Sequence, residues 1–197
     1  LSNNLNRTVE IGSFDVGYLS GEVNLEKIEI NNKDFPGKLL IVDKAFAQLD
    51  ALSFYGETIE IENILLDGVR VNYFSDISNR ASNNFNSLKK TLENKNRSNS
   101  KPDSKKFLIE QLDIKNINVS ATSAELNLTQ KVKLNDMKFT NLGNTKDSKS
   151  YRILTREIIE IVNKEIKSKI KIGDIDEEMI KDKIKEGLKN KLKKLLK

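Results

Sequence analysis

The stretch IEIENILLDGVRVNY, residues 59–73, has the period of a β-strand along most of its length. Apolar and polar side chains alternate in Ile59-Glu60-Ile61 and again in Val69-Arg70-Val71-Asn72-Tyr73. Alternation of this kind directs one set of side chains to each face of a sheet. Two residues instead of one separate Ile61 from Ile64, so the apolar set shifts by one position there. The stretch therefore predicts a long, irregular strand with one apolar face.

The same irregular pattern occurs four times along the chain, at residues 23–30, 59–66, 107–114 and 132–139. Its form is apolar, any, apolar, any, any, apolar, any, apolar. A β-bulge would explain the two-residue step, because one extra residue returns the following side chains to the same face. The apolar positions that we expect to share this face, as the lining of a groove, are Val23, Leu25, Ile28, Ile30, Ile59, Ile61, Ile64, Leu66, Ile109, Leu112, Ile114, Leu134, Met137 and Phe139.

The predicted sheet has little to cover it. Residues 1–76 and 107–142 predict about eight or nine bulged strands, which at about 4.8 Å per strand make a sheet roughly 40 Å wide. Residues 79–93 have a helical period, and residues 94–106 contain no apolar side chain, which predicts a flexible linker. Either the sheet curls on itself, or part of its apolar face stays open as a groove, which is normally a functional feature. The fold class is mainly β with helices (α+β), built on a twisted antiparallel sheet.

The C-terminal residues 144–197 predict a basic tail of amphipathic helices. Residues 1–150 hold 20 basic and 20 acidic side chains, whereas residues 151–197 hold 14 and 9, so the net charge of +5 lies in the tail. Gly173 is suited to end a first helix, and Asp174 with Glu177 resembles a capping box for a second. The second helix could pack on its own sheet, lie on an anionic membrane or dock on a partner protein. Its candidate contact residues are Ile184, Leu188, Leu192, Leu196, Lys189, Lys191, Lys193 and Lys194.

The composition argues against most enzyme classes. The chain has no His and no Cys, which removes thiol nucleophiles, His-based triads and Cys/His zinc sites. The acidic pairs Glu60/Glu62 and Asp174/Asp176 have structural explanations, on the polar face of a strand and at the start of a helix. The basic tail lacks the interleaved aromatic side chains that nucleic-acid binding would require. We therefore expect no enzyme activity, no cofactor, no metal site and no nucleic-acid partner.

Several segments, taken in order, carry a family resemblance. They are Val9–Val16, Ser20–Leu25, Ile28–Asn32, Phe35-Pro36-Gly37, Ile59–Tyr73, Asn83–Leu88, Phe107–Asn118 and Leu134–Gly143. Together they cover about residues 8–143 and resemble the AsmA-like family, bacterial envelope proteins related to TamB and YhdP. One departure is Asn31-Asn32 without a following Pro, where that family often has Asn-Pro.

The resemblance implies a sheet folded like a taco around an apolar groove, in a domain over residues 1–143. It also implies a periplasmic location and an inner-membrane helix before Leu1. The expected function is therefore non-enzymatic phospholipid binding in the groove, in lipid transport or outer-membrane biogenesis, with the membrane surface as a further partner of the C-terminal helix. The alternative is an assembly subunit of an envelope complex, whose tail helices bind a partner protein or which forms a homo-oligomer.

Overall fold

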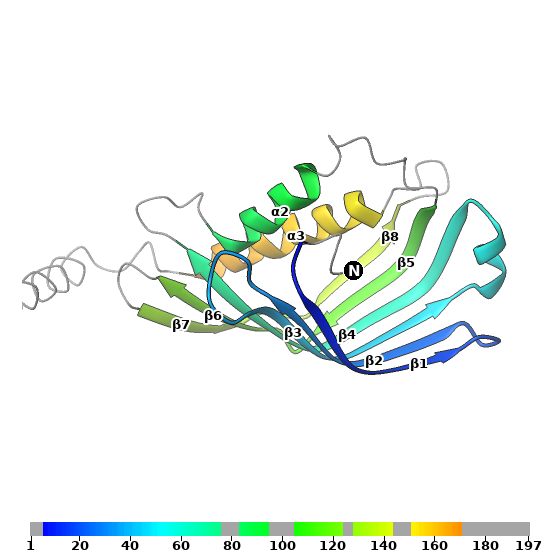
Figure 1. Ribbon diagram of the computed structural model, residues 1–197, viewed down its shortest axis with the longest axis horizontal. Coiled ribbons are helices and arrows are strands. Elements are labelled where there is room, and N and C mark those ends of the chain that lie inside the picture. The colour runs from blue at the N-terminus through cyan, green and yellow to red at the C-terminus, as the bar shows by residue number, and fades with distance from the viewer. Residues whose placement is uncertain (1–5, 76–82, 95–104, 124–127, 144–150, 171–197) are drawn as a thin grey trace, which may run out of the picture.

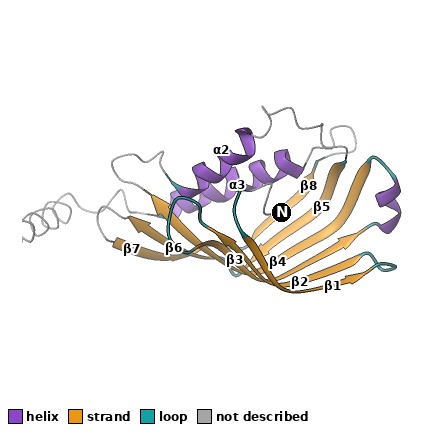
Figure 2. Ribbon diagram, in the orientation of Figure 1, coloured by secondary structure: helices purple, strands orange, loops and turns teal. Residues whose placement is uncertain are grey.

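One mixed, eight-stranded sheet forms most of the structure, with two helices on its concave side (Figures 1 and 2). The computed structural model describes residues 6–75, 83–94, 105–123, 128–143 and 151–170. The strands are β1 (Val9–Gly17), β2 (Glu22–Asn31), β3 (Lys38–Leu49), β4 (Thr58–Ser75), β5 (Lys106–Lys115), β6 (Asn118–Ser123), β7 (Leu128–Lys133) and β8 (Met137–Leu142). The helices are α2 (Asn84–Asn94) and α3 (Tyr151–Lys169), and a 3₁₀ turn, η1, spans Ala51–Tyr55. The predicted class, mainly β with helices, is confirmed.

The strand order is β1-β2-β3-β4-β5-β8, with β6 beside the far half of β4 and β7 beside β6. Thr58 pairs with Lys106 and Arg70 with Asn118, the same offset of 48 residues, so β5 and β6 act as one long strand along β4. Both of these pairs are parallel, and the expectation of a wholly antiparallel sheet is wrong at this point. The reason is the long connection from β4 to β5, which contains α2 and allows the chain to cross back before pairing.

The strands bend along one transverse row of residues. In this row, Lys27, Gly68 and Asn116 have φ angles of 54°, 69° and 53°, in the left-handed region. The pairs on either side of Lys27, Ile11 with Ile28 and Ser13 with Glu26, keep one continuous register. Neighbouring strands therefore all change side-chain alternation at the same level, and none of them gains a residue relative to the next. The residues at this level, which we call the bend row, are Gly12, Lys27, Asp43, Gly68, Asn116 and Asn135.

The bulge hypothesis for the repeated pattern is confirmed in only one of the four segments. Between β3 and β4 the register shifts at Gln48/Leu49, opposite Glu62, which is the two-residue step of segment 59–66. In segment 23–30 the two-residue step contains Lys27, whose backbone is in the left-handed region. The register shift between β2 and β3 lies beyond this step, at Ile30/Asn31. In segment 107–114 the β5–β8 register is unbroken, and in segment 132–139 the step falls between β7 and β8. In segments 23–30 and 132–139 the step lies in the bend row, at Lys27 and Asn135, and leaves no residue unpaired, whereas in segment 107–114 it lies outside that row, at Glu110-Gln111.

The core lies between the concave side of the sheet and helices α2 and α3. Helix α3 contributes Leu154 and Ile166, which are 3% and 0% exposed, so this part of the predicted tail packs in the same core as the sheet. Lys89 of α2 and Glu160 of α3 form an ion pair at 2.6 Å that links the two helices. This pair lowers the pKa of the Glu160 carboxyl and raises that of the Lys89 ammonium. The other buried apolar side chains of this core cluster are those of Leu39, Val42, Ala45, Ile61, Val69, Val71, Tyr73, Phe85, Leu88, Ile109, Leu112, Ile114, Ile117, Val119, Ala121 and Leu134.

Helix α2 is attached to β4 through two asparagines at its start. The Asn83 side chain accepts a hydrogen bond from the backbone N–H of Asn86 at 2.8 Å and so caps the helix. Asn84 is 1% exposed, and its amide donates to the carbonyl of Asn72 at 2.6 Å and accepts from the N–H of Phe74 at 3.2 Å. The helix was predicted over 79–93 and is observed from Asn84 to Asn94; residues 76–82 lie outside the described residues.

The predicted linker 94–106 is shorter at both ends than expected. Asn94 is the last residue of α2, and Lys106 is the first residue of β5. Lys105 donates from Nζ to the carbonyl oxygens of Phe54 at 2.8 Å and Gly56 at 2.5 Å, which joins the start of β5 to the η1 turn. Residues 95–104 lie outside the described residues.

Replacing Asn84 by Ala should lower the free energy of unfolding by about 2 kcal/mol, because the N–H of Phe74 and the carbonyl of Asn72 would lose a buried partner. Chemical denaturation measures this value. Asn24→Ala, at an exposed position of β2, is the control and should change it by less than about 0.5 kcal/mol. Equal losses in both variants would contradict the role assigned to Asn84.

Gly68 and Gly37 offer a comparison that separates backbone strain from steric clash. Both have positive φ angles, 69° and 79°, but a Cβ at Gly68 would lie 2.8 Å from the Cβ of Asp43, whereas nothing lies within 4 Å of a Cβ at Gly37. Gly37→Ala should cost about 1 kcal/mol through φ alone, and Gly68→Ala distinctly more. Thermal or urea unfolding of the two variants tests this, and equal destabilisation would show that the bend row tolerates a side chain at Gly68.

Candidate functional site

All fourteen predicted groove residues lie on one side of the sheet, the concave one. Cross-strand pairing makes this clear, because directly paired residues point to the same face. One row runs Leu25, Ala45, Leu66, Ile114 and Met137, and the next runs Val23, Ala47, Ile64, Leu112 and Phe139. Strand β1 extends these rows with Phe14 and Val16. The remaining predicted residues occupy the neighbouring rows of the same face: Ile28, Ile30, Ile59, Ile61, Ile109 and Leu134.

The two ends of this concave face differ in burial. Beyond the bend row, under α2 and α3, the sheet side chains are almost inaccessible, with Val71 and Val119 both at 2% and Ala121 at 0%. On the other side of the bend row the centre of the sheet is buried, but most of the remaining apolar side chains are only half-buried and Phe14 is 74% exposed. We call this region the open half; its members are Phe14, Val16, Val23, Leu25, Ile59, Ile64, Leu66, Met137 and Phe139.

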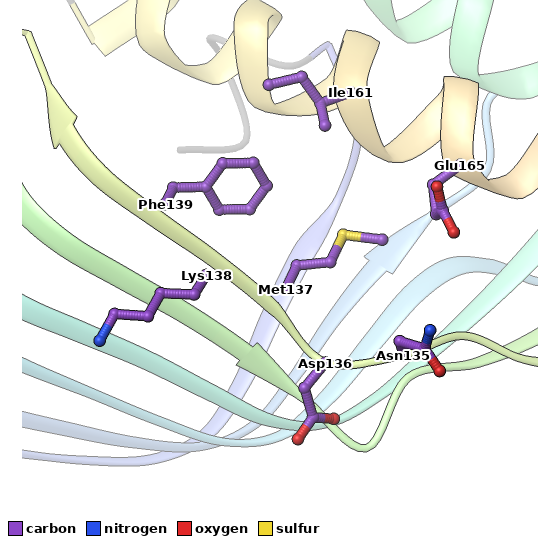
Figure 3. A pocket seen from close by; sticks show the side chains of 7 residues that line it. All are labelled: Asn135, Asp136, Met137, Lys138, Phe139, Ile161 and Glu165. Atoms are coloured by element: carbon purple, nitrogen blue, oxygen red, sulfur yellow. The ribbon is translucent and has the colours of Figure 1, made fainter.

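A cavity lies at the β8 border of the open half (Figure 3). Its volume is about 290 Å³, and Met137, Phe139 and Ile161 form its apolar walls. The remaining lining residues are Asn135, Asp136, Lys138 and Glu165, so its rim is polar. Ile161 is on α3 and is 45% exposed, which means that the helix stands over this edge without closing it. The cavity is thus a recess with both apolar and polar lining, next to the last strand of the sheet.

The end of the sheet beyond the open half carries a second exposed apolar cluster, which we call the tip. It consists of Tyr18 and Leu19 in the β1–β2 turn, which are 88% and 100% exposed, and of Leu52, Phe54 and Tyr55 in η1. The two turns lie side by side, because Gln48 donates from Nε2 to the carbonyl of Ser20 at 2.6 Å and Leu49 N–H donates to the carbonyl of Gly21 at 2.9 Å.

Sequence reasoning missed the tip. Tyr18 and Leu19 lie between the turn signals Gly17 and Ser20-Gly21, and Leu52, Phe54 and Tyr55 lie shortly before the turn signal Gly56. The signal that could have predicted the tip is the presence of large apolar residues in segments with the composition of turns, because exposed turns rarely require such side chains.

The described residues offer little acid–base or metal chemistry. Glu60 and Glu62 are exposed on β4, and Asp174/Asp176 lie outside the described residues. Within the described ranges, no group of three or more acidic side chains could hold a metal ion. Burial raises the pKa of the Tyr73 phenol to about 12, so this hydroxyl stays protonated at neutral pH.

Arg7 is the most deeply buried cation of the described chain, at 6% exposure. Its Nη2 lies 3.4 Å from Ser87 Oγ on α2, and Ser87 Oγ in turn donates to the Asp34 carboxylate. Burial lowers the pKa of Arg7, and the charge of Asp34 opposes that shift. The group holds the segment before β1 against α2, at the covered end of the sheet.

The membrane-contact residues predicted in the tail, from Ile184 to Leu196, lie outside the described residues. Of the helices that the structure describes, none is long and apolar enough to cross a bilayer. Comparison with known proteins adds no relative: neither a protein-family model nor a curated protein matches the chain.

Proposed function

We propose that the protein binds the acyl chains of phospholipids on the open half of its concave face, without catalysing a reaction. The observation that carries the proposal is the unequal cover of one continuous apolar surface. Two helices bury its far end, whereas Leu25, Ile64, Leu66, Met137 and Phe139 remain half-buried beside a recess of about 290 Å³. A continuous apolar surface left partly open is a feature of ligand and partner sites.

The energetics favour a chain-like apolar ligand. Each methylene that moves from water into such a site contributes about 0.8 kcal/mol, so a few segments of an acyl chain supply several kcal/mol. Of the charged residues that line the recess, Glu165 is on α3 at its edge, and the Lys138 side chain points away to the other face of β8 (Figure 3). The arrangement suits a molecule with a long apolar part and a polar end that stays in water.

The cellular setting rests on the sequence resemblance to AsmA-like proteins. We place the protein in the periplasm, attached to the inner membrane by a helix before Leu1, with a role in lipid transport or outer-membrane biogenesis. The tip supports contact with a membrane surface, because Tyr18, Leu19 and Tyr55 are almost fully exposed and adjoin the open half. Tyr and Leu side chains of this kind enter the interfacial layer of a bilayer.

A glutamate in the open half should abolish most of the lipid binding. Leu25→Glu puts a charge on the concave face, and Asn24→Glu puts the same charge on the convex face of the same strand. With a fluorescent diacyl phospholipid as the probe, we expect Leu25→Glu to weaken equilibrium binding at least about tenfold, while Asn24→Glu binds as the unmodified protein does. Equal affinities of the two variants, both folded by circular dichroism, would exclude the open half as the site.

The tip should affect lipid uptake from membranes more than binding itself. We expect the double variant Leu19→Asp/Tyr55→Asp to extract the same probe from phosphatidylcholine vesicles about tenfold more slowly, because two charges oppose insertion of the tip. Binding of the probe presented in detergent should remain unchanged. Ser13→Asp/Glu26→Gln, on exposed positions of β1 and β2, is the control, and an unaltered extraction rate in the tip variant would refute membrane contact there.

The alternative function, an assembly subunit, draws support from a different observation. The tail helix expected to bind a partner lies outside the described residues, but among the described strands those at the two borders of the sheet pair with a strand on one side only. This feature is developed below.

A further inference from the structure

At both borders of the sheet, residues 10–17 of β1 on one side and strands β8 and β7 on the other pair with a strand on one side only within the part of the chain that the structure describes. Strand β1 pairs with β2, and at the other border β8 pairs with β5 and β7 with β6. An outer strand offers a row of backbone hydrogen-bonding groups, and proteins usually protect it with Pro, Lys or a bulge. Strand β1, VEIGSFDVG, contains neither Pro nor Lys, and its register with β2 is unbroken.

The two borders are compatible in direction and in shape. The successive strand pairings from β1 to β8 show that these two strands run in the same direction. Strand β1 of a second copy in the same orientation would therefore lie parallel to β8. Both borders are crossed by the bend row, at Gly12 on β1 and at Asn135 between β7 and β8. If the bend continues from copy to copy, Gly12 of one copy lies beside Asn135 of the next.

This alignment places the most exposed apolar side chain of β1 at the recess. Phe14 would lie beside Met137, and Val16 beside Phe139, all on the concave face. Phe14 is 74% exposed, and Met137 and Phe139 form the floor of the cavity of about 290 Å³ (Figure 3). The Phe14 ring of the next copy would fill a space that α3 leaves open. Apolar surface on both copies would then be buried away from water.

The same alignment brings opposite charges together on the convex face. Asp15 would lie beside Lys138, and Glu10 beside Lys133. Asp15 and Lys138 are both exposed, whereas Glu10 also binds Lys38 of its own chain at 2.9 Å. Opposite charges at paired positions stabilise neighbouring strands, and like charges there destabilise them. Apolar fit, charge and bend thus select one register.

We propose that copies of this protein associate head to tail, with β1 of one copy added in parallel to β8 of the next, in the register that pairs Gly12 with Asn135. The interface is heterologous, so association continues until a ring closes or a filament forms. It lengthens the concave apolar face by one sheet for each added copy. The proposal does not depend on lipid binding, because its evidence lies in the two borders of the sheet.

Disulfide trapping tests the register directly, since the full chain contains no native Cys. Asp15→Cys mixed with Lys138→Cys should give a disulfide-linked dimer under mild oxidation, because neighbouring strands bring paired Cα atoms within the 4.4–6.8 Å that a disulfide spans. Asp15→Cys mixed with Thr140→Cys, two residues out of register, is the control and should give far less. Efficient linkage of Asp15→Cys to itself would instead show that β1 pairs with β1, and would overturn the proposal. No linkage in any mixture, together with a monomer at every concentration in sedimentation, would do so too.

Charge reversal provides a second, reversible test by analytical ultracentrifugation. Asp15→Lys and Lys138→Asp should each raise the dissociation constant for self-association about tenfold, because each places like charges side by side. An equimolar mixture of the two variants should recover the association of the unmodified protein, since each then meets an opposite charge in the other. The double variant Asp15→Lys/Lys167→Asp, which changes an exposed lysine of α3 in place of Lys138, is the control and should associate as weakly as Asp15→Lys alone. Recovery in that control, or its absence in the mixture, would contradict the assigned contact.

Discussion

The structure depends on the cover of a single apolar sheet face. A sheet with one apolar side must bury that side against another layer, and here the described second layer consists of α2 and α3. These two helices cover the far end of β4 and strand β6, where the side chains of Val71, Val119 and Ala121 are almost fully buried. They do not reach across the rest, so the apolar surface continues beyond them.

The bend row decides where the covered part ends. Left-handed residues in β2 (Lys27), in β4 (Gly68) and between β5 and β6 (Asn116) lie at the same level, and the sheet is concave toward the helices. Next to Gly68, the Asp43 carboxylate accepts two hydrogen bonds from Arg70, at 2.8 and 2.6 Å, on the outer face of the bend. Both side chains are about half exposed, so this pair contributes at most about 1 kcal/mol, and the bend rests mainly on the backbone and the apolar packing inside it.

The open half, the tip and the two sheet borders are connected consequences of this incomplete cover. A half-buried apolar surface, exposed aromatic side chains beside it and outer strands that pair on one side only within the described chain are all costly in water unless they meet a ligand, a membrane or another chain. The proposed lipid binding would account for the first two features, and the proposed head-to-tail association for the third. The two proposals are compatible, because added copies would extend the same concave face.

The sequence by itself determined which side chains share a face and where the helical segments lie. Alternation in residues 23–30, 59–66, 107–114 and 132–139 was sufficient, because side-chain direction in a strand depends on local backbone geometry. The helical period around Phe85, Leu88 and Leu92 placed α2 within a few residues of its start, although the capping role of Asn83 and the bonds from Asn84 to β4 were not anticipated.

Only the tertiary structure decided how the strands pair and where the apolar face stays open. The parallel pairing of Thr58 with Lys106 joins residues 48 positions apart, and no local pattern records a contact across a chain crossover. The two-residue steps looked like bulges because a bulge is the local explanation. Two of them, at Lys27 and Asn135, lie in the bend row, which became visible only when neighbouring strands were placed in register. The tip and the cavity beside Met137 likewise arise from turns and helices that meet only in the folded chain, since exposure is a property of the whole packing.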